Sequence, residues 1–200
     1  MPTLFIIAAL SYLLGSIPFG YILVRIFRGQ DVRQTGSGNI GATNVARSSP
    51  ALGVLTLVLD ALKGFAAVVL ARSVFPGQTV LAGTAALFAI LGHLFPVWLR
   101  FRGGKGVATG LGAFVVLAPK AVLCVIGLFV AVVVGLRYVS LGSIVAVASL
   151  PFIVIMLHDY GAPQLPLLIG VSSALILWKH RENIRRLFAG TEPRFQWRRG

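Results

Sequence analysis

The sequence predicts an all-α integral membrane protein with seven transmembrane helices. Of its 200 residues, 57% are hydrophobic and only 12% are charged, and the mean hydropathy is +0.90. Long apolar runs with few charges are typical of membrane proteins that cross the bilayer several times. A net charge of +13 would suggest nucleic-acid binding in a soluble protein. Here the basic residues stand in loops and a tail between apolar segments, where they set orientation and attract anions, so we exclude nucleic acid as a partner.

Apolar segments predict the spans in chain order. Five are clear: 3–25, 53–71, 80–99, 139–157 and 164–178. The first has no basic n-region and no convincing cleavage site, so we expect a retained helix. The segment 107–136 would be about 45 Å long as one helix, which exceeds the hydrocarbon core of about 30 Å. Pro119 and Lys120 in its middle favour two short helices, and the first, 107–118, could cross fully only if the bilayer thins or loop residues extend it.

The distribution of Lys and Arg decides between six and seven spans. With seven spans and the N-terminus outside, Arg72 and Lys120 lie outside, Lys63 is intramembrane, and the other 15 of the 18 basic residues are cytoplasmic. Those 15 are Arg25, Arg28, Arg33, Arg47, Arg100, Arg102, Lys105, Arg137, Lys179, Arg181, Arg185, Arg186, Arg194, Arg198 and Arg199. Six spans would place the basic tail outside, against the positive-inside rule. We therefore expect seven spans, a cytoplasmic C-terminus, and the three polar motifs on the cytoplasmic face.

The first polar motif is the glycine-rich loop 36–47, between the first two spans. Three glycines allow turns and bring backbone N–H groups close to a ligand: Gly36, Gly38 and Gly41. Four residues add short neutral side-chain donors: Ser37, Asn39, Thr43 and Asn44. Arg47 adds a fixed cation suited to phosphate. The motif predicts a site for a small phosphorylated molecule at the membrane surface.

The second polar motif is 92–110, with Gly103, Gly104, Lys105 and Gly106 just before a helix that we expect to start near Val107. Glycine N–H groups at a helix N-terminus, together with one Lys, form an anion cradle. The motif is not a P-loop, which needs Ser or Thr after the Lys and a preceding buried strand. The alternative interpretation is a basic loop that only anchors the protein at the inner interface.

The third polar motif, 180–192, directly follows the last span. His180 and Asn183 are three residues apart and share a face if the segment is helical. An apolar stripe would lie on the membrane or on the other loops: Ile184, Leu187 and Phe188. Alone, the segment is typical of an amphipathic anchor with an incidental histidine. Two anion-type loops on the same face favour a functional role.

Two ionisable features lie within the spans. Asp60 and Lys63 are three apart in the second span, where charges tend to pair or to face a cavity. We favour a structural pair, either Asp60–Lys63 or Asp60–Arg47, over a catalytic role. For His93, near the inner end of the third span, we favour a packed, hydrogen-bonded side chain over a proton-transfer group.

The remaining candidates are few. Ser143 follows the inner turn at Arg137 and either contributes to the site or belongs to a plain helix turn. The five carboxylates are scattered, so no metal site is predicted. The single Cys124 lies in an apolar run, which excludes disulfides and cysteine metal sites.

Three segments of the chain resemble, in this order, the three cytoplasmic motifs of the bacterial acyl-phosphate:glycerol-3-phosphate acyltransferases, the PlsY family. They are Gly36–Arg47, Gly92–Thr109 and His180–Glu192. The resemblance extends from the Leu-Gly-Ser-Ile-Pro-Phe-Gly run at 14–20 to the tail. It implies seven transmembrane helices in one acyltransferase domain over 1–200, located in the bacterial inner membrane with a cytoplasmic active site. We expect a monomer among membrane lipids, without a cofactor.

The resemblance also implies a reaction, the first committed step of phospholipid synthesis. A fatty acyl group passes from acyl phosphate to the sn-1 hydroxyl of glycerol 3-phosphate, giving 1-acyl-glycerol 3-phosphate (lysophosphatidic acid) and inorganic phosphate. Consistently, the chain lacks the His-x4-Asp pattern of other glycerol-3-phosphate acyltransferases.

Acyl phosphate is an activated mixed anhydride, so the reaction needs no protein nucleophile. What remains is to place two anions together and to stabilise the developing negative charge. The resemblance implies that phosphate is held by Ser37, Arg47, Lys105, the loop glycines and Ser143. It also implies that His180 and Asn183 orient glycerol 3-phosphate. The base is either His180 or the phosphate of glycerol 3-phosphate. The alternative function is a carrier for a phosphorylated metabolite, which should show internal repeats that we do not find.

Overall fold

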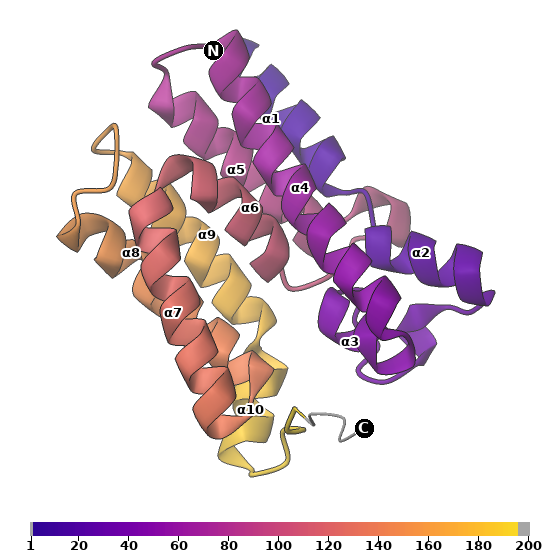
Figure 1. Cartoon of the computed structure of the whole chain (residues 1–200). Coiled ribbons are helices and arrows are strands. Elements are labelled where there is room, and N and C mark those ends of the chain that lie inside the picture. Colours follow the sequence, from indigo (N-terminus) through magenta and orange to yellow (C-terminus); the bar gives the residue numbers. More distant parts are fainter. Residues whose placement is uncertain (1, 196–200) are drawn as a thin grey trace. The chain divides into compact units, whose positions relative to one another are not determined.

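The computed structural model describes residues 2–195, and every regular element in this part of the chain is a helix (Figure 1). The all-α class is therefore confirmed. Two of the basic residues assigned to the cytoplasmic side, Arg198 and Arg199, lie outside the described residues. Contacts divide the chain into two compact units, residues 1–117 and 118–200. The treatment of the whole chain as a single domain stays a prediction.

Helices occupy all the predicted spans. Five helical stretches are long and apolar enough to cross a membrane: Pro2–Arg28, Pro50–Val74, Thr79–Leu99, Pro119–Leu136 and Val139–Met156. Two apolar helices are shorter, α6 (Val107–Leu117) and α9 (Leu165–Lys179). With 11 residues, α6 is about 17 Å long, well short of the hydrocarbon core. The count of seven crossings and the outside N-terminus stay predictions.

Two prolines set helix boundaries within apolar segments. Pro119 separates α6 from α7 (Pro119–Leu136), as the sequence predicts. The expected single helix over 3–25 is instead two helices, α1 (Pro2–Gly15) and α2 (Phe19–Arg28). The physical reason is Pro18, which has no amide hydrogen and disfavours helical geometry in the residue before it.

Unit 1 is built on helices that approach each other through glycines. It adds α3 (Ala42–Ser48), α4 (Pro50–Val74) and α5 (Thr79–Leu94), and the 3-10 turns η1 (Val32–Gln34) and η2 (Val97–Leu99). Helix α1 packs against α5, and α4 against α6. A Cβ at Gly64 would collide with the backbone oxygen of Thr109, and one at Gly112 with that of Ala61. Small residues at helix interfaces are typical of membrane proteins, where they permit close backbone contact.

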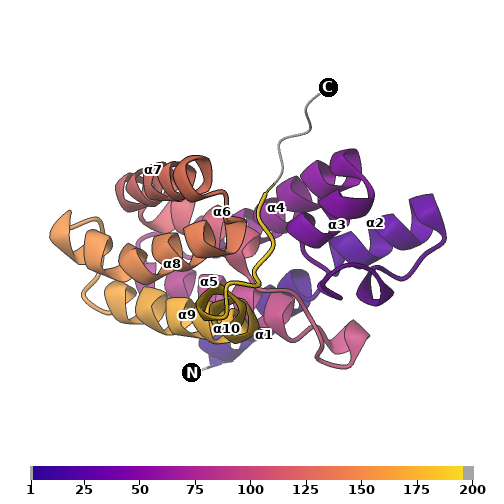
Figure 2. The ribbon, with the colours of Figure 1, turned by 90° about the horizontal axis from the view of Figure 1, so that it is seen from below.

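Unit 2 contains α7, α8 (Val139–Met156), α9 and α10 (Arg181–Phe188). Helix α8 packs against both α7 and α9, and Figure 2 shows α8 and α9 side by side. Arg137, in the left-handed conformation with φ 64°, ends α7 and begins the turn into α8. The short α10 follows α9 after His180 and contacts the ends of α8 and α9.

Candidate active site

The first polar motif is held together by the side-chain amide of Asn44. Its Nδ2 donates to three backbone oxygens, those of Val32 (3.2 Å), Thr35 (3.0 Å) and Asn39 (2.8 Å). Its Oδ1 accepts a hydrogen bond of 2.8 Å from the amide of Ser37. Because Asn44 is only 4% exposed, these contacts satisfy a buried amide and fix the path of residues 32–39 around it.

A small apolar core supports the same loop. Val32, Ile40 and Val45 are buried together with Val24 of α2 and Leu99 of η2. Leu99 belongs to the segment of the second motif, so one core anchors both motifs of unit 1.

The remaining polar side chains of the loop either make hydrogen bonds within it or are exposed. Asn39 Oδ1 accepts a hydrogen bond of 2.9 Å from the amide of Gly41, the N-cap residue of α3. Gly36 and Gly38 have positive φ angles, 56° and 68°, as a tight turn requires. Three predicted site residues have exposed side chains: Ser37, Thr43 and Arg47. The observed bonds of Asn39 and Asn44 lie within the loop, and their contact with substrate stays a prediction.

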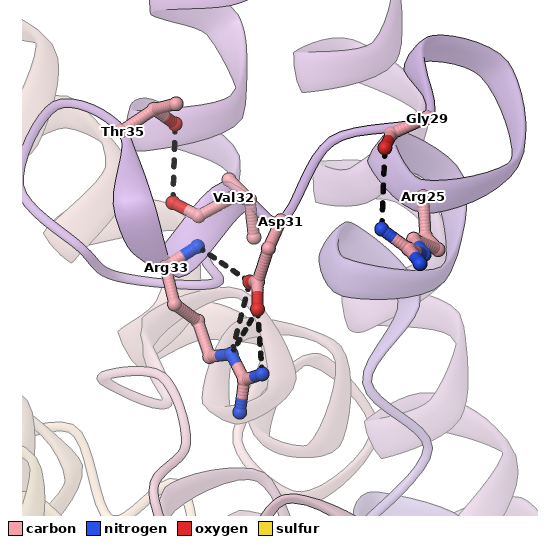
Figure 3. A network of polar contacts seen from close by, with 6 residues as sticks. All are labelled: Arg25, Gly29, Asp31, Val32, Arg33 and Thr35. Atoms are coloured by element: carbon pink, nitrogen blue, oxygen red, sulfur yellow. Dashed lines mark hydrogen bonds and ion pairs between the residues drawn. The ribbon is translucent and has the colours of Figure 1, made fainter.

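An ion pair that was not predicted lies just before this loop in the chain. Figure 3 shows the Asp31 carboxylate facing the Arg33 guanidinium, whose Nη2 lies 2.6 Å from Asp31 Oδ2. Asp31 also accepts a hydrogen bond from the backbone amide of Arg33 and so caps η1. The hydrogen bonds from Arg33 lower the pKa of Asp31 against the opposing effect of its partial burial. The Asp-x-Arg spacing was the available sequence signal.

An open pocket of about 530 Å³ lies beside this pair. It is lined by Tyr21, Arg25, Gly29, Gln30, Asp31, Gln34 and Thr35. None of these residues was predicted to bind substrate, and the pocket borders the first motif at its N-terminal side.

The second motif folds back onto the end of α5. The amide of Gly103 donates to the oxygen of Leu94 (3.2 Å), and that of Gly104 donates to the oxygen of His93 (3.0 Å). The last carbonyls of a helix need donors from outside it, and these two glycines supply them. Their amides therefore hold the loop, and an anion cradle that includes Lys105 and Gly106 stays a prediction. Lys105, partly buried, follows directly and precedes α6.

The third motif turns at Gly190 and returns onto its own helix. Asn183 Nδ2 donates to Glu192 Oε1 and Arg186 Nε donates to Glu192 Oε2, both at 2.7 Å. Burial raises the pKa of Glu192, but the hydrogen bonds from Asn183 and Arg186 oppose this effect, and the pKa is lowered overall. Glu192 was not predicted to have a role, because the turn brings it back to Asn183 only in the folded chain.

His180 stands at the N-cap position of α10 without a side-chain capping bond, and both it and Asn183 are buried. The ring nitrogen Nδ1 of His180 lies 2.8 Å from the backbone oxygen of Ile176. A carbonyl oxygen only accepts, so Nδ1 carries a proton. In the neutral ring the lone pair is then on Nε2.

Two further predictions concern unit 2. Ser143 lies buried in the first turn of α8 and donates a hydrogen bond of 2.9 Å to the oxygen of Val139. In the apolar stripe of α10, Phe188 is 91% exposed, whereas Ile184 and Leu187 are partly buried.

The intramembrane pair is Asp60–Lys63, with 2.8 Å between Lys63 Nζ and Asp60 Oδ1. The alternative partner, Arg47, is exposed. His93 is buried, as expected of a packed histidine.

The predicted site residues thus fall in both units. The first two motifs belong to unit 1, and His180, Asn183 and Ser143 belong to unit 2. That all of them serve one site stays a prediction. Among residues 2–195, no group of three or more His, Cys, Asp or Glu side chains is placed to hold a metal ion.

Comparisons with known proteins identify relatives over most of the chain. A family model described as glycerol-3-phosphate acyltransferase matches residues 5–190. The glycerol-3-phosphate acyltransferase of Nitrobacter winogradskyi is 51% identical over 187 residues, which cover 93% of each chain. That of Geotalea daltonii is 48% identical over 190 residues, covering 93% of this chain and 94% of the relative.

Two solved structures are also similar over the whole fold. Crystal structures of PlsY (YgiH), an integral membrane glycerol 3-phosphate acyltransferase, match in a glycerol 3-phosphate form and a lysophosphatidic acid form. The first has a TM-score of 0.90 and 38% identity and covers 96% of each chain; the second has a TM-score of 0.88 and 36% identity and covers 96% of this chain and 95% of the other. With its family match, its relatives and its fold in agreement, the chain belongs to the PlsY family of integral membrane glycerol-3-phosphate acyltransferases.

Proposed function

We propose that this acyltransferase uses acyl phosphate as its donor and the sn-1 hydroxyl of glycerol 3-phosphate as its acceptor. The hydroxyl oxygen attacks the acyl carbon, the bond from that carbon to the phosphate oxygen breaks, and phosphate leaves with the electron pair. The hydroxyl proton passes to a base. The products are 1-acyl-glycerol 3-phosphate and inorganic phosphate, so neither a covalent enzyme intermediate nor a cofactor is needed.

The observation that carries the proposal is the construction of the first motif. Asn44 and Asn39 hold the loop internally, while Ser37 and Arg47 remain exposed. A preorganised loop that presents a hydroxyl and a guanidinium suits a phosphate group, because the loop needs no ordering when substrate binds. Similar structures of PlsY in glycerol 3-phosphate and lysophosphatidic acid forms support the same acceptor and product here.

Lys105 and Ser143 complete the proposed phosphate contacts. Lys105 stands at the entry to α6, where a cation and the helix N-terminus both favour an anion. The loop glycines at 36, 38, 41 and 106 and the exposed Thr43 give the substrate close access to the backbone. In the developing transition state these groups stabilise charge on the acyl oxygen and the leaving phosphate.

His180 and Asn183 are proposed to orient glycerol 3-phosphate. Because His180 Nδ1 is tied to the oxygen of Ile176, Nε2 is the ring atom that would take the hydroxyl proton. The phosphate of glycerol 3-phosphate is the second candidate base. Turnover of His180→Gln at saturating glycerol 3-phosphate distinguishes the two: near-normal turnover assigns the proton transfer to the substrate phosphate.

We place the reaction at the cytoplasmic face of a bacterial inner membrane, with seven spans, the N-terminus outside and a monomeric protein among membrane lipids. The support for this orientation is the excess of Lys and Arg in the loops and tail assigned to that face.

The test supplies the purified protein in lipid with radiolabelled glycerol 3-phosphate and one donor at a time: acyl phosphate, acyl-CoA or acylated acyl carrier protein. We expect equimolar lysophosphatidic acid and phosphate with acyl phosphate alone, and chromatography should identify the 1-acyl isomer. Activity with the other donors only would disprove the donor assignment. Uptake of glycerol 3-phosphate by proteoliposomes without product would instead support a carrier.

A matched pair of arginine variants tests the loop. Arg47→Ala removes an exposed guanidinium from the proposed site, whereas Arg72→Ala removes an exposed guanidinium from the far end of α4. Loss of a charge-assisted phosphate contact should lower kcat/KM by about 100-fold for Arg47→Ala. Arg72→Ala should behave as wild type, and equal effects would contradict the role of Arg47.

A further inference from the structure

Three ionisable side chains form a buried cluster inside unit 1. Asp60 and Lys63 come from α4 and His93 comes from α5, and their exposed fractions are only 2%, 3% and 4%. Asp60 Oδ1 lies 2.8 Å from Lys63 Nζ and 3.5 Å from His93 Nδ1. Ionisable groups inside a membrane are costly to keep, and they are commonly found where a protein uses them. The proposed reaction assigns no step to this cluster, so its contacts with the rest of the unit indicate what it does.

One contact of the cluster reaches the break between α1 and α2. Lys63 Nζ donates a hydrogen bond of 2.8 Å to the backbone oxygen of Ile17. The same ammonium lies 5.7 Å from the centroid of the Phe19 ring, at the first residue of α2. Because Pro18 interrupts the helix here, Lys63 holds the point from which α2 departs toward the first polar motif.

The other contact reaches the second polar motif. The amide of Gly104 bonds to the backbone oxygen of His93, and a Cβ on Gly104 would collide with His93 Nε2. A Cβ on Gly103 would collide with the oxygen of His93. The two glycines therefore rest directly on His93, and the next residue in the chain is Lys105.

We propose that Asp60, Lys63 and His93 are positioning residues that fix the first and second motifs relative to each other. Asp60 is the shared member, since one of its oxygens faces both partners. Lys63 extends the network to the α1–α2 break, and His93 extends it to the Gly103–Gly104 turn. This inference deepens the proposed function, on which it rests for the statement that the two motifs bind the phosphates of the substrates.

The network predicts which of the two loops should open locally in each variant. Limited trypsin digestion of the protein in nanodiscs measures this opening without any substrate. Exposed Arg28 and Arg33 report on the first motif, and exposed Arg100 and Arg102 report on the second. His93→Asn should speed cleavage at the second pair about fivefold with little change at the first. Lys63→Met should do the reverse, and Asp60→Asn should speed cleavage at both pairs.

Two controls separate local opening from general loss of stability. Thr84→Val removes another buried polar group of α5, one whose hydroxyl donates a hydrogen bond to the oxygen of Val80 in its own helix. It should leave all cleavage rates unchanged. Arg181 and Arg185 of unit 2 are exposed and serve as reference sites within each digest. Equal acceleration at the reference sites and at both loops, or no acceleration in any variant, would overturn the proposal.

A double variant keeps the test decisive if one substitution alone prevents folding. Removing one partner of a buried ion pair leaves an uncompensated charge, whereas Asp60→Asn with Lys63→Met removes both charges together. The double variant should fold and still show faster cleavage at both loops, and unchanged cleavage in it would contradict the network.

Kinetics give the second readout. Misplaced phosphate-binding loops should raise KM for glycerol 3-phosphate about tenfold in Asp60→Asn and His93→Asn, with a smaller change in kcat per folded molecule. A merely structural role would reduce the folded fraction and leave KM unchanged, which would also overturn the proposal. If the wild type does not transfer an acyl group from acyl phosphate, the donor assignment is wrong. The digestion pattern still tests the network in that case.

Discussion

The first and third polar motifs are each organised by one side chain, and the two side chains differ in charge. In the first motif the neutral amide of Asn44 makes four hydrogen bonds, all to backbone groups. In the third motif the carboxylate of Glu192 accepts from the side chains of Asn183 and Arg186. Asn44, the organising residue of the first motif, therefore fixes the path of the backbone. Glu192, the organising residue of the third motif, orients side chains.

Because of this difference, the two motifs should respond differently to pH and salt. Hydrogen bonds between neutral groups do not depend on protonation and are little affected by salt. A carboxylate bound to a guanidinium forms a stronger bond, but the bond depends on pH and weakens as its partner is exposed. Glu192 also orients Asn183, a residue proposed to touch substrate, so titration of the third motif should reach the site directly.

Asn44→Asp should have the largest effect. The carboxylate cannot donate to the oxygens of Val32, Thr35 and Asn39, and it would repel them. Each buried group left without a partner costs about 1–3 kcal/mol. We expect acyl transfer to fall by more than about 100-fold, with loss of the loop's protection from proteolysis.

The matched control for Asn44→Asp is Ser48→Ala, which removes an exposed hydroxyl from the same helix α3. It should keep activity within about twofold of wild type. If Asn44→Asp retained most of its activity, the amide would not be the organiser of the loop.

Gly36→Ala and Gly190→Ala compare the two motifs at equal backbone strain. Both glycines have positive φ, 56° and 67°, so an alanine costs about 1–2 kcal/mol at either position. Only at Gly36 would the new Cβ collide with Asn44 Oδ1, whereas Gly190 has open space around it. Activity measurements should show a loss of about tenfold or more for Gly36→Ala and clearly less for Gly190→Ala. Equal losses would mean that backbone strain alone matters.

The same two motifs show what could be predicted from sequence. The helices followed from apolar runs long enough to span, and Pro119 marked a boundary, because these signals are local. Asn44 was singled out as a donor to a phosphorylated ligand, but the bonds that the structure shows for it lie within the loop, and the folded loop decides its burial. Glu192 carried no signal in a basic tail until the turn at Gly190 brought it to Asn183.

The second motif shows that the fold decides which amides of a glycine-rich loop are available to a ligand. Gly103 and Gly104 suggested free amides for an anion, and the sequence does not reveal that the chain doubles back onto α5. The last carbonyls of that helix then take both amides, because buried carbonyls need donors. The break at Pro18 was missed for a different reason, since hydropathy is continuous across it while helical geometry is not.

Glu192→Gln tests the charged organiser. Gln can still accept from Asn183, but its amide nitrogen cannot accept from Arg186. We expect a loss of about 1–2 kcal/mol, since the Arg186 side chain is 38% exposed and solvent screens part of the bond. Thermal unfolding and KM for glycerol 3-phosphate measure it.

The pH dependence of the difference between wild type and Glu192→Gln identifies the charge as the cause. The pKa of Glu192 is lowered in the folded protein, so the carboxylate stabilises the fold fully above the unfolded pKa of about 4.3. That contribution is lost as pH falls through the lowered folded value. The two unfolding temperatures should therefore differ at neutral pH and converge below about pH 4. A constant difference would show that packing, not charge, is responsible.

Asp31→Asn should give the smallest effect, although the Asp31–Arg33 distance of 2.6 Å is as short as the bonds to Glu192. The Arg33 and Asp31 side chains are 37% and 16% exposed, compared with 6% for Glu192, so water screens this pair more strongly. Exposed ion pairs contribute about 0.2–1 kcal/mol, and Asn can still accept the Arg33 amide that caps η1. We expect a small fall in unfolding temperature at low salt that disappears in about 0.5 M salt, where the Debye length is only a few Å. A loss that persists in high salt would show that the first motif also depends on a charged organiser, and the contrast with Glu192 would then be one of degree.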